Sequence, residues 1–444
     1  MTMPGNEPKS LAQWLAYIER QHPRSIQLGL DRMRTVAGRM RLGRPAKQVV
    51  TVAGTNGKGS TVAFVEAIAR AAGWRVGAYT SPHLLAYNER VRIDGDDVAD
   101  ADLVAGFEAV EAARVLRQAR EDRDVPLTYF EYGTLAALWL FERSKLDLAV
   151  LEVGLGGRLD AVNLVDADVA VVTTVDIDHV DWLGNDREAI GFEKAGIARA
   201  WKPLVLGEDD PPSSVLGHAY AIGASAIRAN CDFFFEALDA QAWRWREVGY
   251  WLQLPMPRLA APAQLRNAAT AIAALRALGK PLPKAAIAQG VAAAQLPGRL
   301  QRFERDGVDI VVDVGHNPQA ARELAAWLRA SPAAGRTFAV FAALGDKDVA
   351  GVVAALGDRI ERWYLAGLAE TGPRGLAVDA FAQRLSGTAA GTGERHADVA
   401  DALQAALAQA RAGDRVLVFG SFHTVAAALG VLQEPPANFL SSRA

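Results

Sequence analysis

The segment "TVAGTNGKGSTVAF", residues 51–64, combines an apolar run, three glycines, a lysine and hydroxyl side chains in an order that suits phosphate binding. The apolar run predicts a buried strand, and the later apolar spacing predicts a helix that begins near Lys58. Backbone N–H groups in such a loop, together with the helix N-terminus, favour an anion, and Lys58 could reach the outer phosphates. We therefore predict a nucleotide phosphate site. The alternative is a plain glycine turn before a helix.

This loop differs from the common phosphate loop, G-x-x-x-x-G-K-[ST]. Val52 stands where that pattern requires its first glycine, and Gly59 separates Lys58 from the first hydroxyl, Ser60. The segment is thus a shortened and shifted form of the loop, and its spacing does not match the motif of the common phosphate-loop proteins.

Polar side chains follow the other strand-like runs of this part of the chain. The apolar, β-branched runs predict parallel strands at residues 49–53, 75–80, 148–153 and 169–175. Ser81 follows the second run, Glu152 ends the third, and Asp178 and His179 follow the fourth. Ligands of open parallel sheets bind beyond the carboxyl ends of the strands, and oxygen-rich side chains beside a triphosphate suit Mg²⁺. A structural role for His179 is the alternative, whereas Glu152 would otherwise be an unpaired buried charge.

Two further segments carry candidate groups with ordinary alternative explanations. In "FEKAGI", the spacing alone favours a solvated Lys194 paired with Glu193. In "LTYFEYGT", Thr128 is a candidate helix N-cap, with Phe130 and Glu131 as the candidate wall of a pocket. Capping is the simpler interpretation there.

A second series of strand-like runs follows the segment "AQLPGRL", residues 294–300. Its runs are "DIVVDVGHNP", "RTFAVFAALGDKD", "RWYLAGL" and "DRVLVFGSFHT". Asp313, His316 and Asn317 follow the first of them, and 346–348 follow the second. Polar residues after consecutive strands predict the edge of a cleft, although turn chemistry also favours Asp, Asn and Gly at such positions.

The alternation of strand-like and alanine-rich helical runs predicts an α/β protein. A chain of 444 residues exceeds one ordinary core, and about 150 residues per domain suggests two or three domains. Proline and glycine in "AQLPGRL" mark the boundary, so we predict domains at 1–296 and 297–444. The first is expected to be P-loop ATPase-like with a parallel sheet, and the second a smaller Rossmann-like α/β domain. The tryptophan-rich stretch 201–262 is expected to form a peripheral strand region with loops.

Composition narrows the function classes. A net charge of -3 gives no general reason to expect nucleic acid or an anionic membrane as a partner. The single cysteine, Cys231, excludes an internal disulfide, and no apolar stretch reaches the about 20 residues that span a bilayer. The polar start "MTMPGNEPKS" does not resemble a secretory signal. We expect a cytoplasmic protein, and nothing in the sequence demands more than a monomer.

Ten short motifs, in order, carry a resemblance to a known family. They are "GTNGKGST", "SPHL", "YNERVRI", "TYFEYGT", "LEVGLGGRLDA", "DHVDWLG", "EKAGI", "LPGR", "DVGHNP" and "GSFHTV". In this order they resemble the bacterial bifunctional dihydrofolate synthase/folylpolyglutamate synthases of the Mur-ligase superfamily. The resemblance runs from about Leu11 to Gln433, nearly the whole chain. It also accounts for the shortened phosphate loop, which this ATP-dependent ligase family uses.

The resemblance implies a role for each matching position. For ATP it implies Gly54, Thr55, Asn56, Gly57, Lys58, Gly59, Ser60, Asn267, Arg299 and Asp313. For the pterin it implies Ile26, Gln27, Leu28, Thr128, Tyr129, Phe130, Glu131, Leu159, Asp160 and Ala161. For two Mg²⁺ ions it implies Ser81, Glu152, His179 and a carbamylated Lys194. As catalytic residues it implies Lys58, Lys194 and, on the glutamate side, His316.

Three positions depart from the family pattern. Gln27 replaces an expected acidic residue, Gly315 replaces the usual alanine, and Gly345 stands where some relatives have histidine. None of them lies in the phosphate loop or among the implied metal ligands. Gln27 is the one that bears on the pterin contact.

The implied activity is ATP-dependent amide formation. L-Glutamate would be joined to dihydropteroate, and further glutamates to tetrahydrofolate, through an acyl phosphate. A cell-wall Mur ligase is disfavoured because no uridine-nucleotide domain is found before Lys47. A single-activity folate ligase stays open, and a nucleotide-dependent binding protein without catalysis is the alternative from another class.

Overall fold

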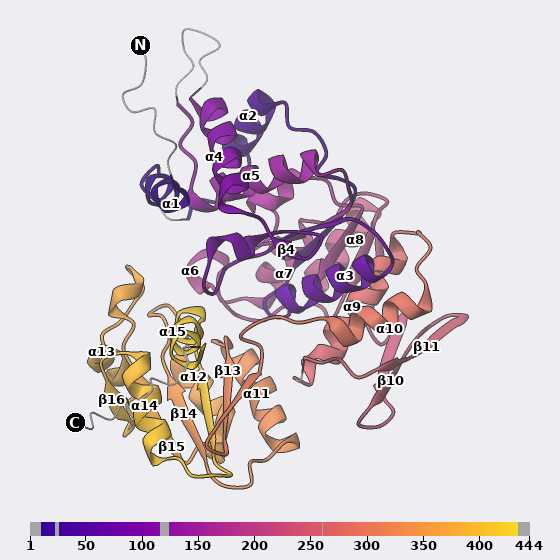
Figure 1. Cartoon of the computed structure of the whole chain (residues 1–444). Helices are drawn as coiled ribbons and strands as arrows, with labels where there is room; N and C mark the ends of the chain where they lie inside the picture. The colour runs from indigo at the N-terminus through magenta and orange to yellow at the C-terminus, as the bar shows by residue number, and fades with distance from the viewer. Residues whose placement is uncertain (1–9, 23–25, 116–123, 260, 434–444) are drawn as a thin grey trace, which may run out of the picture. The chain divides into compact units, whose positions relative to one another are not determined.

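The computed structural model describes residues 10–22, 26–115, 124–259 and 261–433. The chain divides into two compact units (Figure 1). Unit 1 comprises Met1–Arg258 and Gln264–Gln295, and unit 2 comprises Leu259–Ala263 and Leu296–Ala444. No helix within the described residues has the length and apolar character needed to cross a membrane.

The described part of unit 1 is built on an eight-stranded sheet in the order β4-β3-β2-β5-β1-β6-β7-β8. The strands are β1 (Ala46–Ala53), β2 (Val76–Tyr79), β3 (Val91–Ile93), β4 (Asp96–Asp97), β5 (Leu146–Glu152), β6 (Val169–Val172), β7 (Pro203–Leu206) and β8 (Ser225–Arg228). From β2 to β8 all neighbours are parallel, and the short β3 and β4 add an antiparallel edge. The parallel strands bring the ends of β2, β5, β1 and β6 to one edge of the sheet.

Helices cover the sheet of unit 1. They are α1 (Leu11–Glu19), α2 (Asp31–Met40), α3 (Lys58–Ala71), α4 (Asp100–Arg114), α5 (Tyr129–Arg143), α6 (Val180–Leu183), α7 (Arg187–Ala195), α8 (Ser213–Ile222), α9 (Ala263–Ala277) and α10 (Lys284–Ala293). One core joins α1, α2, α4 and α5 to alternate residues of the strands, such as Val49 and Ala53 of β1. Val50 and Val52, which point to the opposite face, are also fully buried. Burial on both faces explains why these strands are continuous apolar runs in the sequence.

The tryptophan-rich stretch forms a small antiparallel sheet in the order β11-β10-β9. Its strands are β9 (Phe233–Ala237), β10 (Ala242–Glu247) and β11 (Tyr250–Pro255). Trp243 and Trp245 of β10 are fully buried, whereas Trp251 of β11 is largely exposed. Trp245 Nε1 donates to Ala269 O of α9 at 3.1 Å, so the buried face of this sheet packs toward that helix. The predicted peripheral strand region is confirmed for 233–255, whereas β7, α8 and β8, earlier in the predicted stretch 201–262, belong to the main sheet and its helices.

The described part of unit 2 contains a six-stranded sheet in the order β12-β13-β17-β14-β15-β16. The strands are β12 (Gln301–Arg305), β13 (Val308–Asp313), β14 (Thr337–Phe341), β15 (Arg362–Ala366), β16 (Glu394–His396) and β17 (Arg415–Phe419). The helices are α11 (Pro318–Ala330), α12 (Val349–Leu356), α13 (Val378–Gln383), α14 (Val399–Gln409) and α15 (Phe422–Gln433). All strand pairs are parallel except the edge pair β12 and β13. Phe341 and Phe419 stack at 4.8 Å between ring centroids in its core.

These two units confirm the predicted α/β class, with a parallel sheet in the first part and a smaller α/β unit after it. The predicted strands and the helix beginning at Lys58 agree with β1, β2, β5, β6 and α3 to within a few residues. The β3–β4 hairpin was not predicted, because strands of two and three residues leave too little pattern to detect.

Candidate active site

The loop between β1 and α3 requires glycine at two positions. Gly54 has φ +149° and Gly57 has φ +87°, in the left-handed region that favours glycine. A Cβ atom at Gly54 would collide with Thr173 Oγ1, and one at Gly57 would lie 2.6 Å from Asn267 Oδ1. The glycines therefore allow a compact loop that ends directly at the N-terminus of α3, where the first-turn N–H groups and the helix dipole favour an anion.

The phosphate loop is fixed to the segment that follows β6. Thr55 N donates to Thr174 O at 2.8 Å, and Thr55 Oγ1 donates to Asp176 O at 2.9 Å. Asn56 N donates to Thr174 Oγ1 at 3.1 Å. Since residues 173–176 lead to His179, these bonds join the phosphate loop and the histidine segment into one structure.

Lys58 and Asn267 lie against this loop. Lys58 Nζ donates to the carbonyls of Gly54 at 2.9 Å and Thr55 at 3.3 Å. Asn267 of α9 is buried, and Gln264 bridges it to the helix by donating to Ser60 Oγ at 3.3 Å and accepting from Asn267 Nδ2 at 3.0 Å. Asn267 was predicted from the family resemblance alone, and the structure brings it to the loop.

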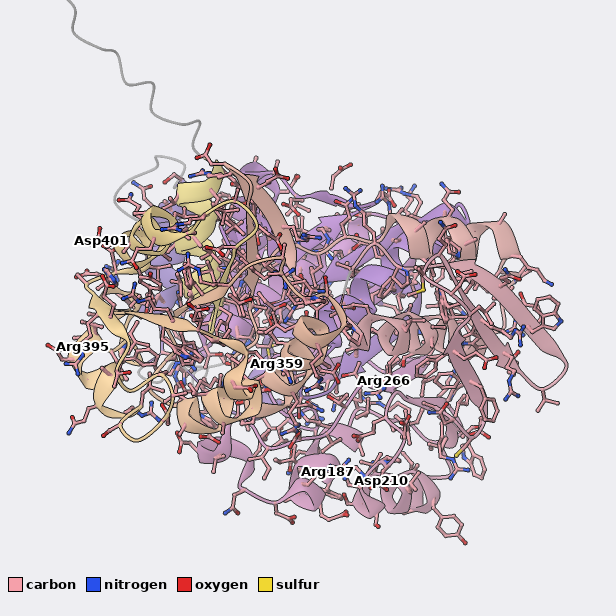
Figure 2. All side chains as sticks on the ribbon, turned by 90° about the horizontal axis from the view of Figure 1, so that it is seen from below. Arg187, Asp210, Arg266, Arg359, Arg395 and Asp401 are labelled. Atoms are coloured by element: carbon pink, nitrogen blue, oxygen red, sulfur yellow. The ribbon has the colours of Figure 1, made fainter. Side chains whose placement is uncertain are left out.

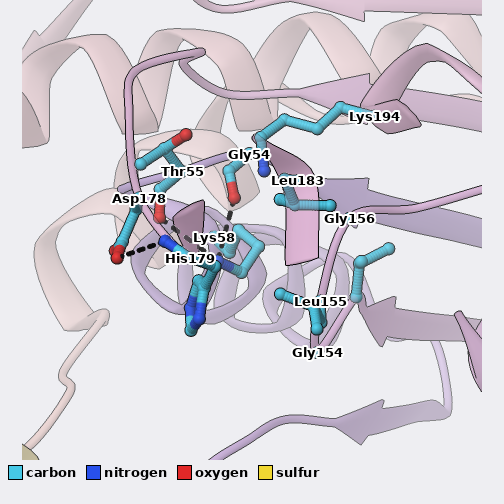
Figure 3. A pocket seen from close by; sticks show the side chains of 11 residues that line it. Gly54, Thr55, Lys58, Gly154, Leu155, Gly156, Asp178, His179, Leu183 and Lys194 are labelled. Atoms are coloured by element: carbon cyan, nitrogen blue, oxygen red, sulfur yellow. Dashed lines mark hydrogen bonds between the residues drawn. The ribbon is translucent and has the colours of Figure 1, made fainter. Parts of the chain in front are cut away.

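A pocket opens where the ends of the strands meet (Figure 3). It is lined by Gly54, Thr55, Lys58, Val153, Gly154, Leu155, Gly156, Asp178, His179, Leu183 and Lys194. Figure 3 shows the side chain of Lys194 reaching into the space that Lys58 and His179 also line. Three candidate residues from distant parts of the sequence thus share one pocket.

Lys194 is buried in this pocket, and the interpretation from spacing alone is wrong. Only 4% of the residue is exposed, and Glu193 pairs instead with Arg158 at 2.8 Å. Burial, and then the nearby positive charge of Lys58, lower the pKa of Lys194 to about 7. Burial therefore favours the neutral amine over the ammonium, unlike at a solvated lysine.

His179 has a left-handed backbone conformation, which hydrogen bonds of neighbouring residues stabilise. Its φ is +53°, and its backbone N–H donates to Asp178 Oδ1 at 2.8 Å. Arg187, which sequence reasoning missed, donates through Nε to Val175 O at 2.8 Å and through Nη2 to Glu208 at 2.9 Å. Figure 2 shows Arg187 beside Asp210, whose carbonyl it also reaches at 2.6 Å. Arg187 thus supports the segment that carries His179.

Ser81 and Glu152 meet at the ends of β2 and β5. Ser81 N donates to Glu152 Oε2 at 3.3 Å, and Glu152 is only 5% exposed. The chain continues from Glu152 directly into Val153–Gly156 of the pocket wall. A buried carboxylate that is bonded to the backbone of a serine offers, with the serine hydroxyl, oxygen ligands of the kind that a hard cation such as Mg²⁺ prefers. Within the described residues, no cluster of three or more His, Cys, Asp or Glu side chains occurs.

The candidate pterin residues of α5 adjoin the same pocket wall. Thr128 caps α5 in a capping box with Glu131, as expected from the sequence. Phe130 packs so closely on Gly154 that a Cβ there would lie 2.8 Å from the Phe130 ring. Tyr129 contacts Tyr87 edge to face at 5.6 Å. The capping and pocket-wall interpretations of this segment are therefore compatible.

Asp160 organises the candidate pterin segment 159–161. Its carboxylate accepts from Leu155 N at 2.8 Å and Val162 N at 3.0 Å. Burial raises the pKa of Asp160 to about 6, although these backbone bonds oppose the rise. Gly29 N donates to Leu159 O at 3.2 Å, so the segment 26–29 lies beside it.

Arg32 is the second arginine that sequence reasoning missed. It forms an ion pair with Glu131 at 2.7 Å and donates to Gln27 O at 2.9 Å. An arginine in the first turn of a helix opposes the helix dipole, which is the one sequence signal that could have singled it out.

The candidate residues of unit 2 also lie together. Asp313 accepts from Leu300 N at 3.0 Å and Gly315 N at 2.7 Å, and burial raises its pKa against the opposing charge of Arg299. His316 Nδ1 lies 2.9 Å from Val314 O. Asn317 and Asp348 cap α11 and α12, so turn and cap chemistry explains those two.

Comparisons with known proteins agree with this architecture. The family described as "Mur ligase, glutamate ligase domain" matches residues 298–422. The dihydrofolate synthase/folylpolyglutamate synthase of Escherichia coli (strain K12) is 47% identical over 423 residues, covering 95% of this chain and 95% of that protein. The solved structure of E. coli FolC with DHPP and ADP is similar with a TM-score of 0.88 and 46% identity, over 96% of this chain and 98% of that one. A bifunctional synthase with Mn, AMPPNP and L-glutamate bound has a TM-score of 0.87 and 46% identity, over 96% and 98%.

A nucleotide-type phosphate loop on one α/β unit and a glutamate-ligase unit after it define a ligase of the Mur type. Such an enzyme couples ATP to the joining of an acid and an amino acid. Within this class, the chain belongs to the bacterial dihydrofolate synthase/folylpolyglutamate synthase family, as its sequence motifs predicted.

Proposed function

We propose that the protein joins L-glutamate to dihydropteroate, and further glutamates to tetrahydrofolate, while ATP is converted to ADP and phosphate. The observation that carries the proposal is the pocket shared by Lys58, His179 and Lys194 beside the phosphate loop. Relatives solved with DHPP and ADP, and with AMPPNP and L-glutamate, support both the nucleotide and the substrates. These relatives support a folate ligase that acts on small molecules, and we propose that it works in the cytoplasm, as its sequence predicts.

The phosphate loop and its neighbours are proposed to bind ATP. The loop 54–60 would bind the phosphates through backbone N–H groups other than those of Thr55 and Asn56, which donate to Thr174, with the Lys58 ammonium against the transferring group. Asn267, which touches the loop, is assigned to the nucleotide as well. Arg299 and Asp313 of unit 2 are proposed to reach ATP, because the resemblance assigns both positions to it.

Ser81, Glu152, His179 and Lys194 are proposed to hold Mg²⁺, with two ions as the family resemblance implies. The buried Glu152 carboxylate, which accepts from Ser81 N, and the Ser81 hydroxyl are oxygen ligands of the kind that such a cation prefers. Lys194 is proposed to react with CO₂, its neutral amine forming an N–C bond and releasing a proton, so that the new carboxylate becomes a ligand. When bound, the metal neutralises charge on the phosphates.

The residues of the chain would perform the rest of the reaction by positioning. A carboxylate is a poor electrophile, so the substrate carboxylate first attacks the γ-phosphate and forms an acyl phosphate. Lys58 offsets the negative charge as it develops. The amino group of L-glutamate then attacks the acyl carbon, and phosphate leaves. His316 is proposed to line the binding site of L-glutamate.

Three segments of unit 1 are proposed to form the pterin pocket: 26–28, 128–131 and 159–161. Hydrogen bonds and packing among them support the assignment. We assign 1–296 to ATP and pterin binding and 297–444 to the glutamate-ligase domain, which the match over 298–422 supports.

Phosphate release tests the proposal. Purified protein is given ATP, Mg²⁺ and L-glutamate with either dihydropteroate or tetrahydrofolate, and the products are identified by mass. We expect phosphate and a product one glutamate larger in both cases. Activity with only one acceptor would reduce the protein to a single-activity ligase, and silence with both would contradict the proposal.

A further inference from the structure

Three segments of unit 1 that lie far apart in the sequence are connected through one arginine. Arg32 Nη2 donates to Glu131 Oε1 at 2.7 Å and to the carbonyl of Gln27 at 2.9 Å. Arg32 Nε adds a longer bond to Glu131 Oε2 at 3.4 Å. Two residues after Gln27, Gly29 N donates to Leu159 O at 3.2 Å. The guanidinium therefore joins 26–28 to 128–131, and the backbone bond of Gly29 adds 159–161 to them.

The helices agree with this arrangement. Arg32 belongs to the first turn of α2, which contacts both α5 and the short 3-10 helix η2 (Ala161–Leu164). Figure 1 shows α2 close to α4 and α5 in this part of unit 1. Arg32 is thus carried by a packed helix rather than by a loop.

Helix stability alone does not explain this ion pair. The capping box needs only Glu131 Oε2, which accepts from Thr128 N at 2.8 Å, whereas Oε1 accepts from Arg32 Nη2. Its negative charge in the first turn of α5 is favourable, whereas the positive charge of Arg32 in the first turn of α2 is not. Buried ion pairs are moreover often no more stabilising than apolar residues of the same volume.

An arginine can do one thing here that an apolar residue or a lysine cannot. Its planar fork holds a carboxylate and a backbone carbonyl at the same time and in fixed directions. The carbonyl belongs to Gln27. Gly29 is held by its backbone bond to Leu159 O, but it has φ +143° and no atom within 4 Å of a Cβ, so side-chain packing does not fix the segment there. Arg32 is the group that fixes 26–28 against the N-terminus of α5.

We propose that Arg32 is a positioning residue for the pterin substrate: it orders the segment 26–28 and orients Glu131, without entering the phosphate site. This inference rests on the proposed function of the same pocket wall. Removing Arg32 should therefore weaken pterin binding selectively, and leave nucleotide binding intact.

The chain offers a closely matched control in unit 2. Arg336 forms an ion pair with Asp414 through Nη2 at 2.7 Å and Nε at 3.5 Å, and Nη2 also reaches the carbonyl of Gln409 at 3.2 Å. The buried acid is 5% exposed at its side chain, against 4% for Glu131. Arg336 and Asp414 precede β14 and β17, at the ends of the strands opposite to the candidate site residues. Arg336→Ala therefore removes the same type of interaction away from the chemistry.

The experiment compares Arg32→Ala, Arg32→Lys and Arg336→Ala in the full-length enzyme by steady-state kinetics. We expect Arg32→Ala to raise the KM for dihydropteroate by about ten-fold or more, while the KM values for ATP and glutamate stay within about two-fold. Arg32→Lys keeps the positive charge but loses the planar fork. Its KM for dihydropteroate should therefore lie between those of the wild type and Arg32→Ala. Arg336→Ala should leave all three KM values unchanged, whatever it does to the melting temperature.

A double-mutant cycle with Glu131→Gln separates positioning from bulk stability. If Arg32 acts through Glu131, Arg32→Ala in the Glu131→Gln background should add much less to the KM than it adds alone. An equal rise in the KM for ATP, or a KM for dihydropteroate no higher than that of Arg336→Ala, would overturn the inference. If Arg32→Ala does not fold, a KM for dihydropteroate that is unchanged in Arg32→Lys would also overturn the inference. A wild-type enzyme that is silent with every pterin substrate would instead contradict the proposed function.

Discussion

The phosphate side and the pterin side of unit 1 are built in different ways. The phosphate side is made mainly of backbone in one stretch, 54–60, whose glycines and helix N-terminus lie next to one another in the sequence. The proposed pterin side is made of three distant segments: Arg32 joins 26–28 to Glu131, and Gly29 N donates to Leu159 O. A site of the first kind is encoded locally and depends on conformation, and a site of the second kind depends on long-range packing. The two should therefore fail differently when single residues are changed.

The largest effect is expected on the phosphate side, at Lys58. Two lysines line the pocket among the described residues, Lys58 and Lys194, and Lys58→Ala removes the one whose ammonium donates to carbonyls of the phosphate loop. We expect activity to fall by a factor of about 10³ or more, because phosphoryl transfer depends on charge stabilisation. Circular dichroism should show a folded protein. Full turnover by a folded variant would contradict the proposal that this loop and Lys58 bind the phosphates of ATP.

Gly54→Ala tests the conformational nature of the same side. The new Cβ meets Thr173 Oγ1, and φ +149° is itself unfavourable for alanine. We expect loss of nucleotide binding and a fall in the free energy of unfolding of about 2–4 kcal/mol. Gly73→Ala is the matched control, since it has φ +82° but no atom within 4 Å of the new Cβ. Equal effects of the two on ATP binding would show that backbone strain, rather than the tight loop, is responsible.

Lys194 lies between the two sides and gives a pH-dependent prediction. Since its pKa is lowered to about 7, the amine is neutral above that pH and charged below it. Carbamylation needs the neutral amine, so the carbamate should be present above about pH 7 and lost as the pH falls through that value. ¹³C NMR of the metal-free protein under ¹³CO₂ measures this directly.

Lys194→Ala supplies the complementary test of the carbamate. Activity should be lost and then restored in part by short carboxylates, which can occupy the place of the missing group. The absence of any rescue, together with no ¹³C signal at any pH, would show that Lys194 acts as an amine.

The smallest effect is expected from Thr128→Ala on the pterin side. The substitution removes the N-cap of α5, which costs about 1 kcal/mol of stability. The KM for dihydropteroate should rise a few-fold because Tyr129, Phe130 and Glu131 follow the cap, while the KM for ATP stays constant. Thr128→Ser keeps the hydroxyl and should restore both values. A change in the KM for ATP alone would break the proposed division between the two sides.

The same contrast explains how much could be predicted from the sequence. The strand–loop–helix at 46–71 and the class of fold were predictable, because apolar periodicity and glycine spacing are local signals. Glu152 could be singled out as an acid at the end of an apolar strand. The burial of Lys194 could not, since "FEKAGI" has the pattern of an exposed helix end. Arg32 and Arg187 were missed because an arginine looks ordinary until the distant carboxylate and carbonyl it contacts are known.

The most direct test of the central claim uses substrate labelled with ¹⁸O in its carboxylate. Wild-type enzyme is incubated with ATP, L-glutamate and labelled dihydropteroate, and the released phosphate is analysed by mass. An acyl phosphate transfers one labelled oxygen, so the phosphate should carry one ¹⁸O atom for each amide bond formed. Phosphate without label, in a reaction that still forms the amide, would contradict ATP-driven activation of the carboxylate at this site.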